Sequence, residues 1–364
     1  MIRRRRAVVT ALGEARPGAH ELEVAIEGTH QLARAIAYPA LVGPVTAGDE
    51  VLLNTTAVEL GLGTGGVHFV IAVLGREPVD DELPGRVMKA RYTPLQTAVA
   101  AVEEREAERL EHADLHGLPV VCAPLHSMVG PVAAGMKAAL PDARVAYVMT
   151  DGAALAGSFS RLVVELRDAG LLDEWITCGQ AFGGELEAVT IWSGLLAASE
   201  ILRADAVVVA DGPGNVGTET TWGVSALASG NALNAVAALG GRPIPALRVS
   251  FADTRERHRV VSHHSLTILS RVCLVETNVA VPALEDDERR EAVWSALRDA
   301  GLEARHQLVE VTGNPAVDEL ARRGLDVRTM GRGVADDPEF FLAAGAAGVL
   351  AGRLAAESRR WSAS

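Results

Sequence analysis

The spacing of apolar and polar positions changes near Pro94 and divides the chain into two parts. Before this point, short apolar runs alternate with turn residues such as Pro17-Gly18 and Gly48-Asp49. Many short strands separated by frequent turns are typical of small β-barrels and sandwiches. We therefore predict a β-rich N-terminal domain over residues 1–92, with strands at Arg6–Leu12, Glu21–Ile26, Gln31–Tyr38, Glu50–Asn54, His68–Leu74 and Gly85–Arg91.

After residue 93, apolar segments of strand length alternate with longer segments of helical spacing. The first of these, Leu95–Leu115, has the charge pattern of an amphipathic helix. Alternating strands and helices imply a parallel sheet that is covered on both faces. We predict a three-layer, mostly parallel α/β domain over residues 93–355 and a frayed tail over 356–364, with strands at Leu118–Cys122, Arg144–Thr150, Glu174–Cys178, Ala206–Ala210 and Leu247–Phe251.

The later part of this domain carries weaker signals. Leu269–Val275 is an apolar, strand-like run, Gln307–Thr312 has the pattern of a strand, and Val327–Met330 that of a short strand. A final helix is expected from Pro338, because proline is favoured at the first helical position and an aspartate precedes it.

The stretch Ala206–Thr218, AVVVADGPGNVGT, marks the centre of the predicted sheet. Its continuous apolar run is typical of a strand buried on both faces. The run ends in Asp211 and three glycines, and a helix follows. In open α/β folds, ligands bind at this carboxyl edge of the sheet, where free backbone N–H groups precede a helix.

The same kind of ending recurs at five successive predicted strands. If these strands are parallel, all five clusters lie on one edge and converge on one cleft. Aspartate after a strand is also a common helix N-cap, so a capping role stays open for each aspartate separately. The clusters are His126-Ser127; Asp151-Gly152; Gln180 with Gly183-Gly184-Glu185; Asp211 with Gly212-Pro213-Gly214-Asn215 and, beyond it, Thr218; and Asp253.

These residue types suit acid/base chemistry on an anion. Carboxylates that lie close together raise one another's pKa values, which favours a shared proton or a bound cation. Asp151 and Asp211 are therefore candidate ligands for Mg²⁺ or another divalent metal, and glycine amides would hold an anionic substrate. The candidate catalytic residues are His126, Asp151, Asp211, Asp253 and His264.

Two familiar nucleotide-binding motifs are absent. The segment Gly212–Thr218 has neither the glycine spacing of a Rossmann fingerprint nor the lysine of a Walker loop. A Gly-x-Ser-x-Gly nucleophile elbow is also missing around Ser127. Hydrolysis or group transfer therefore fits better than redox chemistry with a nicotinamide.

A basic region follows the last of the five clusters. Arg255, Arg257 and His258 precede the pair His263-His264, and Arg255 is a candidate clamp for a phosphate or carboxylate. If the pair is extended, its two side chains point in opposite directions, so only one of them faces the cleft. A surface loop held by salt bridges is an equally good interpretation.

Composition restricts the partners and the compartment. The 364-residue chain has a net charge of −13, which argues against general affinity for nucleic acid or anionic membranes. Its three cysteines have no metal-binding spacing and are expected to be buried, reduced thiols. No apolar run approaches the roughly 18 residues that span a bilayer. We expect a cytoplasmic protein with a small-molecule ligand, and leave a homo-oligomer open.

Five segments together resemble a bacterial family that is described only as a domain of unknown function. They are NTTAVELGLGTGGVHF (54–69), MKARYTPLQ (88–96), PLHSM (124–128), MTDGAAL (149–155) and ADGPGNVGT (210–218). The resemblance runs over nearly the whole chain. It implies a bacterial cytosolic protein without an assigned activity, and it supplies no catalytic residues. The first of these segments is glycine-rich over 61–66, where backbone amides that wrap an anion and a plain flexible loop both stay open.

The sequence leads to two functional hypotheses. The first is a hydrolase or transferase that acts on a small anionic metabolite, with phosphorylated compounds among the candidates. The second is a ligand-sensing or scaffold protein that uses the same cleft without turnover. An oligomeric assembly protein, with glycines serving close packing, is a third.

Overall fold

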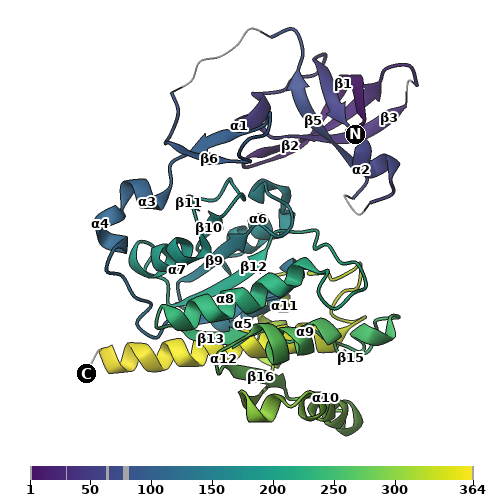
Figure 1. The fold of residues 1–364 in the computed structure, drawn as a ribbon. Helices are drawn as coiled ribbons and strands as arrows, with labels where there is room; N and C mark the ends of the chain where they lie inside the picture. The colour runs from purple at the N-terminus through teal and green to yellow at the C-terminus, as the bar shows by residue number, and fades with distance from the viewer. Residues whose placement is uncertain (1, 30, 63–64, 77–81, 363–364) are drawn as a thin grey trace. The chain divides into compact units, whose positions relative to one another are not determined.

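The computed structural model describes residues 2–29, 31–62, 65–76 and 82–362 (Figure 1). Two compact units are present, Met1–Val99 and Ala100–Ser364. Each unit has a hydrophobic core of its own.

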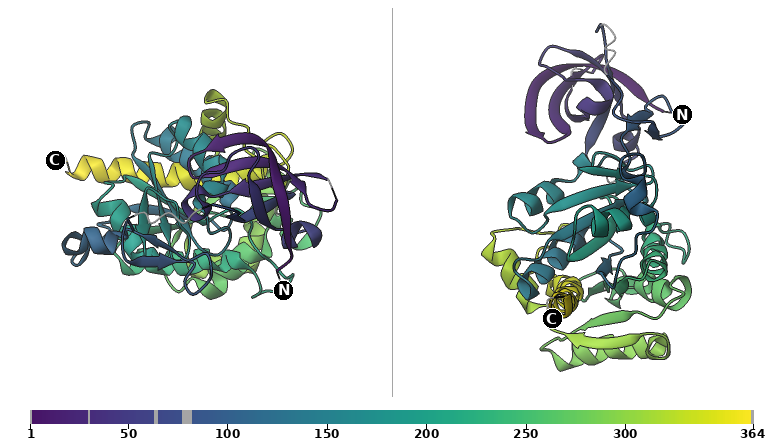
Figure 2. Two further views of the ribbon diagram at one scale, coloured as in Figure 1. Left: turned by 90° about the horizontal axis from the view of Figure 1, so that it is seen from above. Right: turned by 90° about the vertical axis from the view of Figure 1, so that its left-hand side faces the viewer.

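The first unit is a closed β-barrel of five strands in the order β1-β2-β3-β5-β4, with β4 pairing back onto β1. Strands β3 and β5 are parallel, and the other neighbours are antiparallel. This is the strand order of the Greek-key barrels of the OB type. The predicted barrel-like domain is confirmed (Figure 2, right). The strands are β1 Arg4–Arg16, β2 Ala19–Ile26, β3 Leu32–Ala37, β4 Glu50–Asn54 and β5 Val67–Val73.

Alternating side chains fill the barrel. Val9, Val24 and Leu53 are buried in its interior. Their neighbours on the same strands point outward, as the two-residue period of a strand requires. Short elements connect the strands: α1 Pro39–Val42, α2 Thr56–Glu59, and the hairpin β6 Val87–Lys89 with β7 Thr97–Val99.

The glycine-rich segment of the barrel is only partly a loop. Helix α2 forms within it, and Glu59 pairs with Arg3, which precedes β1. Gly61, Gly65 and Gly66 have positive φ. Residues 63–64 of the predicted anion loop lie outside the described residues, so its role stays a prediction.

The second unit contains a six-stranded, all-parallel sheet in the order β11-β10-β9-β12-β8-β13. Strand β12 comes fifth in the chain but pairs between β9 and β8. The α/β class predicted from the alternation of strands and helices is confirmed. The strands are β8 Pro119–Cys122, β9 Val145–Thr150, β10 Glu174–Cys178, β11 Leu186–Ala188, β12 Ala206–Asp211 and β13 Arg242–Pro245.

Both faces of this sheet are covered, and β12 illustrates the arrangement. Val208 and its second neighbours belong to one buried cluster, while Val207 and Val209 belong to the other. The first face is covered by α5 Val129–Ala139 and α12 Pro338–Ser362, with α6 Arg161–Asp168 and α11 Asn314–Arg322 in the same buried cluster; the second is covered by α7 Ile191–Glu200 and α8 Ala228–Ala238. Helix α10 Asp287–Asp299 packs instead against β15 Val260–Val261 and β16 Asn278–Pro282.

One predicted strand of the sheet is wrong. Leu247–Phe251 does not join the sheet; β14 Val249–Ser250 pairs instead with β15 Val260–Val261. The sixth strand is β13, which pairs with β8 at the edge. Its two prolines, Pro243 and Pro245, disguise it in the sequence, although proline is tolerated on an edge strand.

Several shorter elements also differ from expectation. Residues 95–115 form no long helix but two single turns, α3 Val102–Arg105 and α4 Ala107–Leu110. The run Leu269–Val275 is not a strand: helix α9 His263–Thr267 continues into a π-helical turn, Ile268–Val272. No strand forms at Val327–Met330, where only Thr329 and Arg332 bridge. Strands β16 Asn278–Pro282 and β17 Gln307–Val311 form a parallel pair, of which only β17 was predicted.

Helix α12 begins at Pro338, as predicted, and runs to Ser362 instead of fraying from residue 356. Its end is held by Arg359, which contacts Asp205 and Asp142. By length and composition α12 could cross a membrane, although no apolar run of this length was expected from the sequence. However, 78% of that apolar window is buried inside the unit, as in the core helix of a soluble domain.

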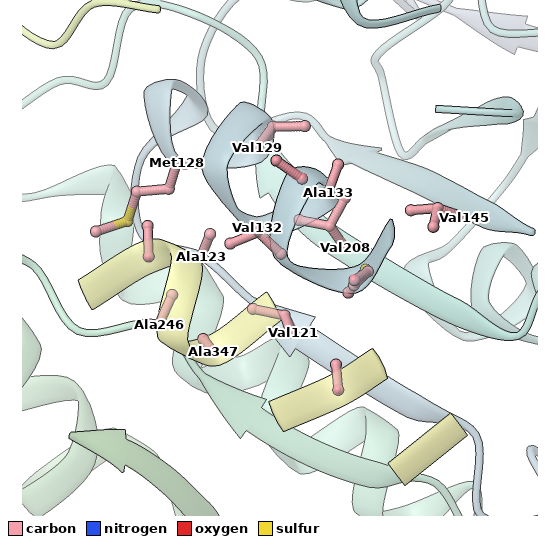
Figure 3. Close-up of a cluster of buried hydrophobic side chains, with 14 of the residues drawn as sticks. Val121, Ala123, Met128, Val129, Val132, Ala133, Val145, Val208, Ala246 and Ala347 are labelled. Atoms are coloured by element: carbon pink, nitrogen blue, oxygen red, sulfur yellow. The ribbon is translucent and has the colours of Figure 1, made fainter. Parts of the chain in front are cut away.

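Helices α5 and α12 pack closely against each other, and Val132 of α5 and Ala347 of α12 lie in one buried cluster (Figure 3). A Cβ added at Gly348 of α12 would lie 2.0 Å from the carbonyl oxygen of Val132 in α5. Conversely, a Cβ at Gly135 of α5 would lie 2.4 Å from the carbonyl oxygen of Gly345. These contacts are with backbone atoms, which cannot rotate away. The glycines therefore set the distance between the two helices.

We predict that Gly348→Ala destabilises the second unit by about 2 kcal/mol, because the added methyl group forces the helices apart. Urea unfolding followed by circular dichroism measures the change. The matched control is Gly217→Ala, whose Cβ meets nothing closer than 3.7 Å, at Val224 Cγ2. Equal stability of the two variants would contradict the role given to Gly348.

Candidate functional site

Asp211 ends β12 at the carboxyl edge of the sheet and joins this strand to β9. Its Oδ1 accepts hydrogen bonds from Thr150 Oγ1 (2.6 Å) and from the backbone N–H of Gly152 (3.0 Å). Among the described residues, none donates a hydrogen bond to Oδ2. The side chain is nearly buried, with 5% of the residue exposed. One carboxyl oxygen is thus fixed, and the other is left for a ligand.

The environment of Asp211 favours its protonated form. Burial is the largest effect and raises the pKa of this carboxyl. The hydrogen bonds from Thr150 and Gly152 lower the pKa in part, and the charge of Asp151 raises it again. The net result is a raised pKa, which is a feature of catalytic carboxyls.

Asp151 is exposed and links the ends of β9 and β10. Its Oδ2 accepts a hydrogen bond from the backbone N–H of Gln180 (2.8 Å). A Cβ at Gly179 would lie 2.2 Å from this oxygen, and a Cβ at Gly152 would lie 2.5 Å from Asp211 Oδ2. The two glycines therefore make room for the two carboxylates.

His126 lies beneath this edge, in the turn that follows β8. Its Nε2 is 2.7 Å from Ser160 Oγ, and its Nδ1 is 3.2 Å from both the Tyr147 hydroxyl and the Asp211 carbonyl oxygen. Burial lowers the pKa of His126 to about 4. The imidazole is thus neutral near pH 7 and holds the backbone of Asp211. Its catalytic role stays a prediction.

The loop after β12 is anchored to its neighbours by two contacts. Asn215 Nδ2 donates to the carbonyl of Pro124 (3.1 Å), and Ala154 N donates to the carbonyl of Pro213 (3.1 Å). Gly212 is required by close approach, since its Cβ would lie 2.7 Å from the Ala154 carbonyl oxygen.

Beyond these anchors, the loop is exposed. Gly214 has φ +97°, where glycine is favoured. The Thr218 hydroxyl contacts Thr220 Oγ1 (3.1 Å) and the Gly223 carbonyl (3.1 Å). The predicted binding role of these residues is not tested by these contacts.

The predicted amide cradle between β10 and β11 is occupied by the protein itself. Gly183 N donates to Glu187 Oε1 (2.6 Å), and Gly184 N donates to Thr177 Oγ1 (3.0 Å). Glu185 Oε2 accepts from the backbone N–H of Trp175 (3.1 Å). These amides are therefore engaged in this conformation and do not face an anion.

Asp253 follows β14, which pairs with β15 and not with the six-stranded sheet. Its carboxylate accepts hydrogen bonds from Arg248 (2.7 Å) and Arg255 (2.9 and 3.0 Å). The hydrogen bonds from Arg255 are the largest of the effects that hold the pKa of Asp253 well below its usual range. Asp253 therefore does not follow a strand of the sheet, as had been expected, and the Arg255 guanidinium is paired with it; its convergence with Asp151 and Asp211 stays a prediction.

Three histidines form a cluster beside this arginine pair. His258 lies in a short turn, Glu256–His258, and His263 and His264 begin α9. The rings of His263 and His264 have centroids 3.8 Å apart. Opposite directions were expected only for an extended backbone, and this condition is not met because α9 begins at His263.

Two hollows lie at opposite edges of the sheet. A cavity of about 10 Å³, the size of one water molecule, is lined by Asp211, Thr150, Pro124 and neighbouring small residues. An open groove of about 370 Å³ lies at the amino edge, beside Asp205 and Arg359. Asp205 and Arg359 pair with each other in this larger groove. The carboxyl of raised pKa, Asp211, lies at the carboxyl edge beside the smaller hollow.

The proposed metal ligands Asp151 and Asp211 have no third ligand beside them among the described residues. Within the described part of the chain, no third histidine, cysteine, aspartate or glutamate joins them at metal-ligand distances; the group that meets this condition is His258, His263 and His264. Metal binding at the two aspartates stays a prediction. Thr150, Tyr147 and Ser160 were not among the residues predicted from the sequence: Thr150 lies in the segment MTDGAAL, but no motif assigns a role to any of the three.

The fold defines an α/β protein with a parallel sheet, preceded by a five-stranded β-barrel. A family model described as "Protein of unknown function (DUF3866)" matches residues 34–348. The chain therefore belongs to this family, as its five segments indicated. No curated protein matches it.

We predict that His126 makes the protein less stable in mild acid. The unfolded chain binds a proton near pH 6.5, whereas the folded protein binds it only near pH 4. The stabilisation is present above pH 6.5 and is lost as the pH falls, by about 2 kcal/mol at pH 5. Urea unfolding at pH 7.5 and pH 5 measures it.

Burial also lowers the pKa values of other histidines, such as His258 and His306, and these contribute to the same pH dependence. The contribution of His126 is therefore measured by comparing variants. Between pH 7.5 and pH 5, the free energy of unfolding of His126→Gln should fall by about 2 kcal/mol less than that of the wild type. His112→Gln, at an exposed position, should behave as the wild type. An identical pH dependence in all three proteins would contradict the assignment.

Proposed function

We propose that the α/β unit is an enzyme that hydrolyses, or transfers a group from, a small anionic metabolite at the carboxyl edge of its sheet. Phosphorylated compounds are among the candidate substrates. In this proposal Asp211 carries the proton, and the protein works in the cytoplasm without binding nucleic acid or membrane.

The observation that carries the proposal is the position of Asp211. After β9 the chain continues to β10 on one side, and after β12 it continues to β13 on the other. Such a switch point is where open α/β sheets bind ligands. A nearly buried carboxyl of raised pKa lies at this point.

Asp211 has the features of a general acid or base. When protonated, its carboxyl group can donate to a leaving group; when ionised, it can accept a proton from water. Thr150 and Gly152 hold Oδ1, which leaves Oδ2 for this transfer. Burial is the main cause of the raised pKa of Asp211, and the charge of Asp151 adds to it.

An anion-binding group lies beside the same loop. Arg257 Nη2 is 3.3 Å from Glu219, whose side chain is 78% exposed. An exposed ion pair of this kind contributes about 0–1 kcal/mol. A substrate anion could therefore replace Glu219 at little cost and be held by Arg257.

The test compares Asp211→Asn with Asp205→Asn, which removes an acid at the other end of β12. Asparagine keeps an oxygen that accepts from Thr150 and Gly152, so the fold is retained while the proton is lost. Wild-type protein is screened by thermal shift against inorganic phosphate, pyrophosphate and sugar phosphates, and for p-nitrophenolate release from p-nitrophenyl phosphate. Each variant is compared with its own ligand-free melting temperature.

We expect a turnover that falls about 10²–10⁴-fold in Asp211→Asn and is retained in Asp205→Asn. Ligand binding without turnover would favour the sensor hypothesis. Turnover that persists in Asp211→Asn would contradict the proposed role of this residue.

A further inference from the structure

We propose that His258, His263 and His264 bind a transition-metal ion such as Zn²⁺. One ring nitrogen from each of the three residues lies within 4.8 Å of the others. The proposal is independent of the role given to Asp211.

The local fold brings the three rings together. Ser262 caps α9 by accepting a hydrogen bond from His264 N (3.4 Å), which places His263 and His264 in the first turn. His258 precedes this turn by one short strand, and its ring centroid is 5.2 Å from each of the other two. The three imidazoles thus face one small volume.

Two of these rings have a buried nitrogen without a partner. His263 Nε2 and His264 Nδ1 are inaccessible to solvent, and no described residue hydrogen-bonds to them. Leaving a buried polar atom unpaired costs about 1–3 kcal/mol. A metal ion would satisfy both lone pairs at once, which gives the cluster a physical reason to exist.

The third ring is already oriented by its neighbours. His258 is 3% exposed, and its Nδ1 is 2.9 Å from Ser262 Oγ. If Nδ1–H donates to this hydroxyl, the lone pair is on Nε2, where it can bind the metal. A hydrogen bond of this kind on the second ring nitrogen is typical of metal-binding histidines. Arg248 Nη1 also lies 3.3 Å from His258 Nδ1 and can only donate, so metal binding requires Arg248 to leave Nδ1 and keep its pair with Asp253.

The chemistry of the ligands points to zinc more than to magnesium. Imidazole nitrogens suit Zn²⁺, Cu²⁺ and Ni²⁺, whereas Mg²⁺ prefers oxygen. Zn–N bonds of about 2.0–2.1 Å place tetrahedral ligands roughly 3.4 Å apart, so small side-chain rotations close the site. Three protein ligands leave a fourth position open, as in catalytic zinc sites.

The neighbouring charges suggest what occupies the fourth position. Arg257 and Arg248 raise the local positive potential enough to contribute to the lowered pKa values of His263 and His264. A bound Zn²⁺ would add to this charge, and a hydroxide or another anion at the open position would offset it.

The experiment uses the full chain, freed of metal with a chelator. Zn²⁺ binding is measured by calorimetry, and Co²⁺ binding by its visible absorption bands. We expect one ion per chain, and an affinity that falls about 100-fold or more in His263→Ala and His264→Ala. The control is His112→Ala, which removes an exposed histidine and should bind as the wild type.

Absence of binding to the wild-type protein would overturn the proposal, as would undiminished binding in both alanine variants. If these variants do not fold, the wild-type protein alone gives the answer. Zn²⁺ should then protect His263 and His264, but not His112, from modification by diethylpyrocarbonate, as read by mass spectrometry. Unchanged modification of His263 and His264 would overturn the proposal equally.

Discussion

The parallel pairing of β12 between β9 and β8 is the constraint on which the candidate site depends. Strands β8, β9 and β10 precede β12 in the sequence, yet β12 lies between β9 and β8 in the sheet. As a result, the ends of β8, β9 and β12 meet at one edge. The contacting residues Asn215 and Pro124, for example, are 91 positions apart in the sequence. Asp211, Asp151 and His126 are neighbours because of this insertion.

Close packing then fixes the details. The sheet can carry strands that are apolar on both faces because α5, α12 and their neighbours bury one side and α7 and α8 the other. Glycines also allow the closest contacts, both in the core and at the carboxyl edge. Gly348 lies between α5 and α12, and Gly152 and Gly179 lie beside the carboxylates of Asp211 and Asp151. The same physical property, the absence of a Cβ, thus serves the core and the site.

The sequence predicted the parts whose signal is local. The central strands are continuous apolar runs, and Asp211, Asp151 and His126 follow them directly, so their shared edge could be inferred. The edge strand β13 could not, because Pro243 and Pro245 mask it and only its pairing with β8 defines it. The same error assigned Asp253 to the end of a sheet strand, whereas it follows β14 of a separate strand pair.

The histidine cluster shows a different limit. The sequence places His263 beside His264 but does not say whether the backbone is extended or helical there. A helical start brings the rings together, and the turn before it adds His258. Similarly, no motif assigns a role to Thr150 or Ser160, and their hydrogen bonds join segments that are distant in the chain.

The central claim is that Asp211 holds its proton more tightly than an ordinary aspartate. Infrared difference spectroscopy of its carboxyl stretch, wild type minus Asp211→Asn across a pH titration, measures this directly. The account predicts a midpoint above the usual value of 3.8, moving downward when Asp151 is replaced by asparagine. A midpoint at or below 3.8 would contradict it.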